Sequence, residues 1–235
     1  MATSASTPYS YDLSNEEDVK HYLKNIEIEY SFHCFSEKNP DGCYRLASFY
    51  DTIKIDKKKA MKLYQTNCDD NEHGDSCNKL AKHMMLKGKL GGGIKDGKTE
   101  DIFKYHHKAC QYGNNESCYS SALMNMDPDY VGENKNLKKC LEYFNKACDR
   151  NDGRSCSKLG EIYRKGSHVQ RDMIKALEYH KKGCDLEMPQ SCVNLSYMYR
   201  KGDGIPKNDD LAEKYRDIVK KLAEKDKAST MKMSQ

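Results

Sequence analysis

The sequence predicts an all-α fold: a solenoid of five two-helix hairpins, closed at its C-terminal end by a further helix. Three observations lead to this prediction. Ten of the eleven cysteines form near-neighbour pairs, the pairs recur at steps of 34, 42, 38 and 36 residues, and apolar or small residues stand at helical spacings around each pair. Self-similarity with a period in this range is typical of helical repeat arrays.

The cysteine pairs are the most regular feature of the 235-residue chain. Their members lie nine or eight residues apart: Cys34 with Cys43, Cys68 with Cys77, Cys110 with Cys118, Cys148 with Cys156, and Cys184 with Cys192, while Cys140 is left over. Such pairs indicate a disulfide framework with one bond in each hairpin. Reduced cysteines buried as small apolar residues are the alternative. The chain has no Cys-x-x-Cys motif, which argues against a metal site or a thioredoxin-type redox motif.

The two helices of each hairpin, A and B, share a pattern. In helix A, a small or apolar residue stands eight positions before the first cysteine: Ala60, Ile102, Cys140 and Ala176. An aromatic residue or Leu stands three positions after that residue: Leu63, Tyr105, Tyr143 and Tyr179. In helix B, the residues three, four and seven positions after the second cysteine follow a common pattern. They are Leu46, Ala47 and Tyr50; Leu80, Ala81 and Met84; Ser121, Ala122 and Asn125; Leu159, Gly160 and Tyr163; Leu195, Ser196 and Tyr199. These offsets lie on one helical face, and the third hairpin fits least well.

Turn-forming residues separate the two helices, so the first cysteine ends helix A and the second opens helix B. A disulfide there clamps the hairpin at its turn, and closing a loop of this length stabilises the fold by about 2.5 kcal/mol. We expect the small residue of helix B to let the two helices approach closely. Cys140 stands where other hairpins have alanine, which predicts a packed free thiol; a redox-reactive thiol is the alternative.

The pattern also predicts the boundaries. Residues 1–13 are expected to be disordered, and 14–224 to form a single solenoid, followed by a frayed tail over 225–235. The repeats are expected at 14–55, 56–97, 98–135, 136–171 and 172–207, with a capping helix over 208–224. Ser14-x-x-Glu17 resembles a capping box that opens the first helix, which we expect to run through Ile28. Two longer connections are expected at 87–98 and 127–132.

Composition argues against several classes of function. The 40 basic and 36 acidic residues are mixed along the chain and leave a net charge of +4, so no nucleic-acid partner is expected. No apolar stretch approaches the length of a membrane span, so we expect no membrane insertion. The first residues lack the basic and apolar regions of a secretory signal and the arginine of a mitochondrial presequence.

Several motifs identify a family resemblance. The period, the Leu-small-x-x-Tyr pattern of helix B and the ending Tyr199-Arg-Lys-Gly-Asp-Gly204 resemble Sel1-like repeats, which are similar to tetratricopeptide hairpins. The paired cysteines resemble the bacterial Hcp-type cysteine-rich proteins. His33-Cys34, followed by the segment from Glu37 to Leu46, is similar to the first repeat of mitochondrial Sel1-like proteins that assist the assembly of cytochrome c oxidase. The resemblance implies a right-handed α/α solenoid.

The resemblance also implies a function: a non-catalytic, protein-binding scaffold of the mitochondrial intermembrane space that supports assembly of complex IV. Its partners would be a respiratory-chain subunit or assembly intermediate and the import oxidoreductase of that compartment. The cysteine pairs indicate a similar compartment independently of the resemblance, because persistent disulfides need an oxidising environment. Because the sequence shows no export signal, we expect the protein to be retained in this compartment by oxidation of its cysteine pairs after it has crossed the outer membrane.

A redox protein is the alternative from another class, working by thiol–disulfide exchange (a disulfide reductase-type activity) or by handling haem. His107 and His180 lie near the ends of A helices, but an unligated histidine is the prediction for each. Ser155-Cys-Ser-Lys158 matches the bare Ser-x-x-Lys pattern of β-lactamases, and we interpret it as a chance match. No catalytic residue, metal ligand or required cofactor is therefore predicted.

Overall fold

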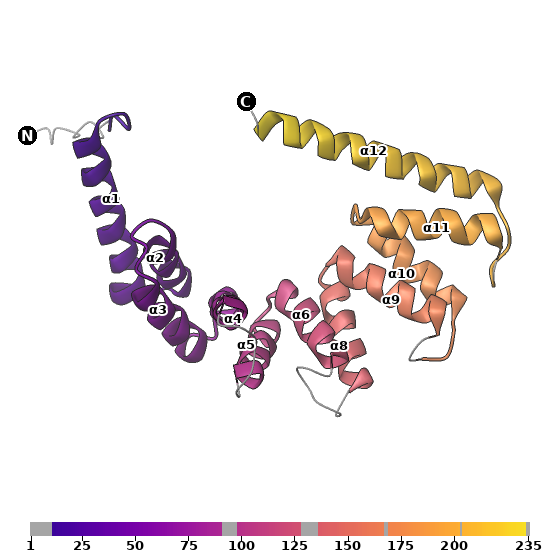
Figure 1. Cartoon of the computed structure of the whole chain (residues 1–235), viewed down its shortest axis with the longest axis horizontal. Coiled ribbons are helices and arrows are strands. Elements are labelled where there is room, and N and C mark those ends of the chain that lie inside the picture. Colours follow the sequence, from indigo (N-terminus) through magenta and orange to yellow (C-terminus); the bar gives the residue numbers. More distant parts are fainter. Residues whose placement is uncertain (1–10, 91–97, 128–135, 167–168, 203, 234–235) are drawn as a thin grey trace, which may run out of the picture. The chain divides into compact units, whose positions relative to one another are not determined.

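The computed structural model describes residues 11–90, 98–127, 136–166, 169–202 and 204–233, without side chains for 87–90, 98 and 230–233. These residues form eleven α-helices and one π-helical turn, with no strand among them, which confirms the predicted all-α class (Figure 1). Contacts divide the chain into two compact units, Met1–His83 and Met84–Gln235, and the boundary falls inside a helix. The predicted single solenoid over 14–224 stays a prediction.

The N-terminal unit contains α1 (Glu16–Ser31), which continues into the π-helical turn η1 (Phe32–Ser36), then α2 (Pro40–Thr52), α3 (Lys57–Asp70) and the first part of α4 (Gly74–Leu90). The expected capping box is off by one residue. The Asn15 side chain caps α1 by accepting from the backbone N–H groups of Glu17 and Asp18, while the Ser14 hydroxyl donates to Asp12 instead. The first helix also continues beyond the predicted end at Ile28.

The C-terminal unit contains the rest of α4, followed by seven helices: α5 (Lys98–Gln111), α6 (Asn115–Met126), α8 (Leu137–Asp149), α9 (Gly153–Lys165), α10 (Met173–Asp185), α11 (Pro189–Lys201) and α12 (Asp209–Met233). The last helix is longer than the predicted 208–224. It packs along α11, where Ser196 Oγ donates to the carbonyl of Ala212 at 2.7 Å, and its Lys225 Nζ bonds the Glu187 carboxylate at 2.6 Å.

Two other predicted segments are partly outside the described residues. Residues 1–10 lie outside them, whereas Tyr11 is placed and its hydroxyl accepts from Asn25 Nδ2 at 2.6 Å. The expected connection over 87–98 is shorter, because α4 continues to Leu90 and α5 begins at Lys98. Most of the expected connection over 127–132 lies outside the described residues. None of the described helices combines the length and apolar character that crossing a membrane requires.

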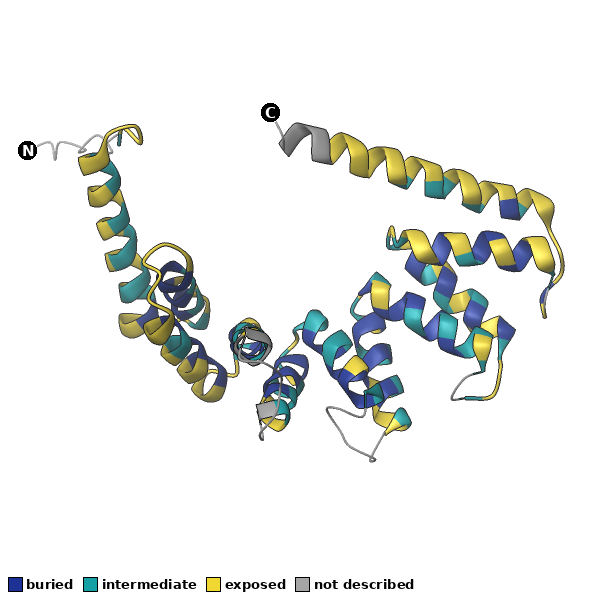
Figure 2. Cartoon of the chain, viewed as in Figure 1, coloured by how far each residue is buried: buried dark blue, intermediate teal, exposed yellow. Residues whose placement is uncertain are grey.

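The predicted helix B face forms the core (Figure 2). Leu46, Leu80, Leu159 and Leu195 are each no more than 1% exposed. The corresponding residues of the poorly matching third hairpin, Ser121 and Asn125, are buried as well. Asn125 Nδ2 donates to the carbonyl of Ser121 at 2.8 Å, whereas the Ser121 hydroxyl has no hydrogen-bond partner among the described residues.

The close approach within a hairpin has a different cause from the predicted one. The small residue four positions after the second cysteine faces the next hairpin: a Cβ on Gly160 would lie 2.7 Å from the His180 ring of α10. Within the hairpin, the residues just before the two cysteines pack together, and they are complementary in size. Gly42 accommodates His33, where an added Cβ would meet the His33 Cβ at 2.6 Å, and Gly183 accommodates Ser191.

Candidate functional site

The ten paired cysteines lie where the prediction places them, at the turn of each hairpin. Their sulfur atoms are at bonding distance in five pairs: Cys34 with Cys43, Cys68 with Cys77, Cys110 with Cys118, Cys148 with Cys156, and Cys184 with Cys192. The S–S distances are 2.08–2.14 Å and the Cα–Cα distances are 4.3–4.9 Å, within or close to the usual range for a disulfide. No described cysteine pairs across two hairpins.

Burial differs among the pairs. The second cysteine of each later hairpin is fully buried, and these are Cys77, Cys118, Cys156 and Cys192. Their partners are 0–5% exposed, whereas Cys34 and Cys43 are 6% and 7% exposed. The first pair is therefore the one that solvent reaches most easily.

Cys140 is a buried free cysteine of α8. It is 1% exposed and belongs to the core cluster that contains Phe144 and Ala147. Burial raises the pKa of its thiol to about 11, and a thiol that stays protonated is a poor nucleophile. The position therefore has the packing environment of the alanines that stand there in other hairpins, Ala60 and Ala176, both of which are 0% exposed.

The Ser-x-x-Lys match does not form a catalytic pair. Ser155 is fully buried at the start of α9, and its hydroxyl has no hydrogen-bond partner among the described residues. Lys158 Nζ donates to Glu161 at 3.1 Å instead. A buried serine precedes the second cysteine in four hairpins, at Ser76, Ser117, Ser155 and Ser191. Ser155 is therefore a packing residue of the repeat.

The two singled-out histidines lie on different helices, α5 and α10, in different surroundings. His107 forms a 2.5 Å hydrogen bond with the Tyr143 hydroxyl and stacks on Phe103. His180 is fully buried, neither ring nitrogen has a partner among the described residues, and burial lowers its pKa to about 4. Within the described part of the chain, no group of three His, Cys, Asp or Glu residues is placed to hold a metal ion.

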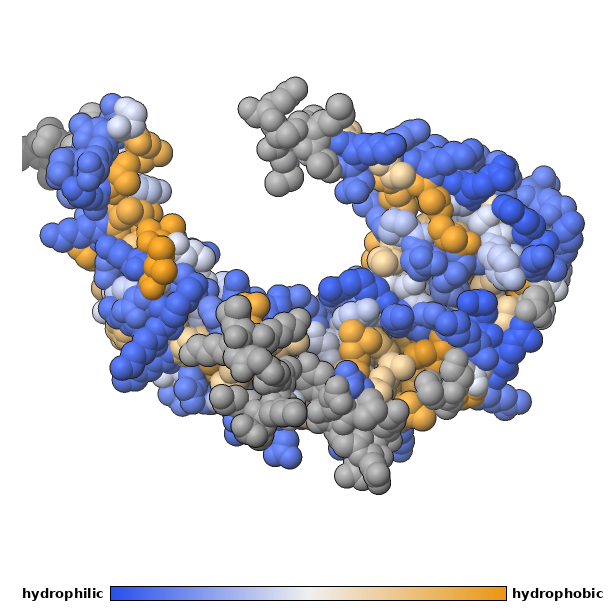
Figure 3. Space-filling model, viewed as in Figure 1, coloured by the Kyte–Doolittle hydropathy of each residue, from blue (hydrophilic) through white to orange (hydrophobic). Residues whose placement is uncertain are grey.

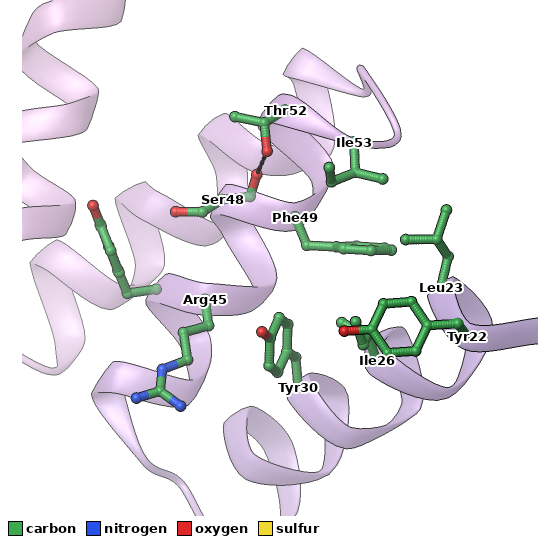
Figure 4. A pocket seen from close by; sticks show the side chains of 10 residues that line it. Tyr22, Leu23, Ile26, Tyr30, Arg45, Ser48, Phe49, Thr52 and Ile53 are labelled. Atoms are coloured by element: carbon green, nitrogen blue, oxygen red, sulfur yellow. Dashed lines mark hydrogen bonds between the residues drawn. The ribbon is translucent and has the colours of Figure 1, made fainter. Parts of the chain in front are cut away.

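An apolar groove between α1 and α2 is the candidate binding site, and sequence reasoning did not find it. It has a volume of about 390 Å³ and is lined mainly by aromatic and aliphatic side chains. Figure 4 shows Leu23 and Ile26 of α1 pointing toward Phe49 of α2, with Tyr22 and Ile53 at the edge. Arg45 is the charged side chain of the lining. Such a surface favours an apolar partner with a polar rim.

The groove is open because of its place in the repeat. In later hairpins, the ring four positions before the first cysteine packs onto the preceding hairpin, and these rings, Tyr64, Phe144 and His180, are 0% exposed. The equivalent ring of the first hairpin is Tyr30, which is only partly buried and packs edge-on against Phe49 of its own hairpin. Tyr30 lines the groove, so part of the packing surface of the array is left free there.

Helix α1 contributes less to the buried core than its neighbours α2 and α3. It has no buried residue, and Figure 3 shows hydrophobic atoms exposed along it on the visible face. Polar contacts fix it instead: the Tyr50 hydroxyl donates to Glu27 Oε1 at 2.5 Å and accepts from Lys59 Nζ at 2.5 Å. The hydrogen bond from Tyr50 lowers the pKa of Glu27. This network ties α1 to α2 and α3 while its apolar side chains stay available.

Comparison with known proteins agrees with the repeat architecture. The Sel1 repeat family model matches residues 40–67, 116–152, 153–188 and 189–215. A solved Sel1 repeat protein from Oxalobacter formigenes superimposes with a TM-score of 0.68, covering 88% of this chain and 83% of that protein at 20% identity.

Two curated relatives carry the same name. Cytochrome c oxidase assembly factor 7 of Xenopus tropicalis is 37% identical over 228 residues, covering 95% of this chain and 96% of the relative. The Homo sapiens protein of that name is 32% identical over 163 residues, covering 66% of this chain and 68% of the relative. The chain belongs to the Sel1 repeat family and is a homologue of the cytochrome c oxidase assembly factor 7 proteins.

Proposed function

We propose that this protein is a non-catalytic scaffold that supports the assembly of cytochrome c oxidase. Its client is a subunit or assembly intermediate of that complex, and an apolar segment of the client lies in the groove between α1 and α2. The name of the relatives supports the process. The free packing surface at Tyr30, Phe49 and Ile53 supports the mode of action, because repeat arrays bind through the faces that their own repeats leave uncovered.

The compartment is part of the same proposal: the intermembrane space of mitochondria. The supporting observation is that all five cysteine pairs lie at disulfide distance inside single hairpins, so each bond can form without any other part of the chain. In each bond, two thiols lose two protons and two electrons, and the disulfide of an import oxidoreductase becomes a dithiol. The oxidised hairpins are then too rigid to leave through a pore.

The test of the scaffold is complementation. In cells that lack the protein, Ile53→Glu is expected to lower the amount of assembled cytochrome c oxidase on native gels, because it puts a charge at the edge of the apolar groove. Tyr197→Glu is the matched control, since Tyr197 is 51% exposed and Ile53 is 50% exposed. Equal rescue by both variants would contradict the assignment of the groove. Protease protection in intact and osmotically opened mitochondria tests the compartment.

Thiol–disulfide exchange remains a second candidate, and one observation favours it. The Cys34–Cys43 pair lines a pocket and is slightly exposed, so a partner thiolate has a path to it. Titration of free thiols in mild glutathione separates the two functions. A scaffold keeps one reactive thiol per denatured chain, whereas a redox protein gains two more as this bond opens.

A further inference from the structure

The N-terminal unit contains a second pocket, on the side of the A helices. It has a volume of about 610 Å³ and lies between η1, the start of α2 and α3. Its apolar part comprises Phe35, Leu63 and the Cys34–Cys43 pair. Phe35 is 64% exposed, and it stands where the C-terminal unit has the polar residues Gln111 and Asp149, which are exposed as well.

The equivalent space in the C-terminal unit is bridged by tyrosines. The tyrosine five positions before the first cysteine reaches the preceding A helix: Tyr143 bonds His107 at 2.5 Å, and the Tyr179 hydroxyl donates to Asn145 at 2.8 Å. In the N-terminal unit the same position is Leu63, which has no polar group. Its expected partner, Ser31, donates to its own helix, to the carbonyl of Glu27 at 2.6 Å.

A second row of bridges is missing as well. In the C-terminal unit, the residue after the first cysteine pairs with a lysine of the next A helix. Lys146 Nζ donates to Gln111 at 3.2 Å, and Lys182 Nζ lies 3.6 Å from Asp149. The corresponding residues of the N-terminal unit are Phe35 and Thr66, which cannot form such a pair, and both line the pocket. Two independent substitutions therefore leave the same space open.

The charges around the pocket are mostly positive. Lys38, Lys59 and Lys62 line it, and Asp70 is the carboxylate of the lining. Lys59 bonds Tyr50, whereas Lys38 and Lys62 are exposed and form no ion pair with the described residues. Elsewhere on the A-helix side, lysines such as Lys182 have a carboxylate partner. The pocket thus combines an apolar floor with two lysines, Lys38 and Lys62, that form no ion pair with the described residues.

We propose that this pocket holds an acidic, amphipathic segment of a partner protein, with an apolar side chain against Phe35 and Leu63 and carboxylates beside Lys38 and Lys62. The inference rests on the proposed scaffold function and adds the chemistry of a second contact. An apolar anchor supplies most of the affinity of such a contact, and complementary charges on its rim select the partner and its orientation.

The test uses the oxidised, full-length protein and fluorescence anisotropy of a labelled helical peptide that has Leu and Phe on one face and Glu beside them. The same peptide with Gln for each Glu measures the contribution of charge. We expect the acidic peptide to bind, and Lys38→Glu with Lys62→Glu to weaken it by about tenfold or more. Lys181→Glu with Lys201→Glu is the matched control, because these lysines are also exposed and lie outside the pocket. Leu63→Tyr is expected to weaken binding too, by filling the space.

Several results would overturn the proposal: no binding to the wild-type protein, equal binding of the Gln peptide, or equal loss in the control variant. Stronger binding to vesicles of anionic phospholipid that depends on Lys38 and Lys62, or self-association that depends on them, would assign the pocket to a membrane surface or a second copy instead. The scaffold function is tested separately. The variant with both pocket lysines replaced could lose peptide binding and yet restore the assembly of cytochrome c oxidase fully. The proposed contact in the pocket would then be wrong, while the proposed binding of the client in the groove between α1 and α2 would be unaffected.

Discussion

The two units are built from the same kind of hairpin, but they differ in how its surface is covered by side chains. In the C-terminal unit, tyrosines stack across successive hairpins, Tyr163 on Tyr179 at 5.6 Å and Tyr199 on Tyr215 at 5.8 Å. In the N-terminal unit the tyrosine pair across hairpins, Tyr44 with Tyr64 at 5.8 Å, is tilted rather than stacked. Several large apolar side chains are exposed in this unit: Tyr22, Ile28, Phe32, Phe35, Ile53 and Ile55. The repeat thus provides a frame, and the side chains that bridge repeats decide whether a face is closed or free to bind.

We expect this difference to give the two units separate tasks. Both units bridge their hairpins by hydrogen bonds, such as Tyr64 with Ser48 in the N-terminal unit and Tyr179 with Asn145 in the C-terminal unit. The N-terminal unit lacks the tyrosine bridge at Leu63 and keeps the groove and the pocket open. Contiguous exposed apolar patches mark interaction sites. Substitutions in the C-terminal unit are therefore expected to change the stability of the protein, and those in the N-terminal unit to change its partners.

The largest expected effect on stability is loss of a buried disulfide. Cys148→Ser with Cys156→Ser should lower the free energy of unfolding by about 2.5 kcal/mol from loop entropy, and further because two hydroxyls enter a fully buried site. Urea denaturation measures it. Cys34→Ser with Cys43→Ser should cost less, since water reaches that pair. If both variants unfold like the wild type, the cysteines do not stabilise the hairpins.

Acid sensitivity is expected from His180. Burial lowers its pKa from 6.5 to about 4, so the unfolded chain binds the proton more readily than the folded one. Its contribution to stability is therefore complete above about pH 6.5 and falls as the pH drops toward 4, by up to about 1.4 kcal/mol per pH unit. His180→Phe should flatten this dependence, because Phe144 fills the equivalent position. Urea midpoints at several pH values test it, and an unchanged slope would contradict the assignment.

A smaller effect is expected for the tyrosine bridges. Tyr179→Phe removes the hydrogen bond to Asn145 and should cost about 1 kcal/mol, with faster amide exchange in α8 and α10. Tyr197→Phe changes an exposed ring and is the control. Equal stability of the two variants would mean that the bridges do not close the C-terminal unit.

The smallest effect is expected at Cys140. Cys140→Ala should change the free energy of unfolding by no more than about 1 kcal/mol, because alanine fills the same position in other hairpins. It should also abolish the one free thiol that is detected after denaturation without reductant. A remaining thiol would show that one of the five pairs is open.

Much of the fold follows from short-range pattern, and the binding surfaces do not. The spacing of cysteines with Leu46, Leu159 and their equivalents specifies hairpins, because helical offsets and buried faces are local properties. The groove and the pocket are open because side chains that bridge neighbouring hairpins elsewhere in the chain are missing there. Leu63 appeared as a conservative replacement for tyrosine, and only the hydrogen bonds of Tyr143 and Tyr179 show what it lacks.

Site-specific photo-crosslinking inside mitochondria tests directly whether a client binds the N-terminal unit, with the crosslinker at position 53 in that unit or at position 197 in the C-terminal unit. The two native side chains are equally exposed, at 50% and 51%. We expect an adduct with a subunit or assembly intermediate of cytochrome c oxidase from position 53, identified by mass spectrometry, and none from position 197. The same adduct from both positions, or from position 197 alone, would contradict the assignment of binding to the N-terminal unit.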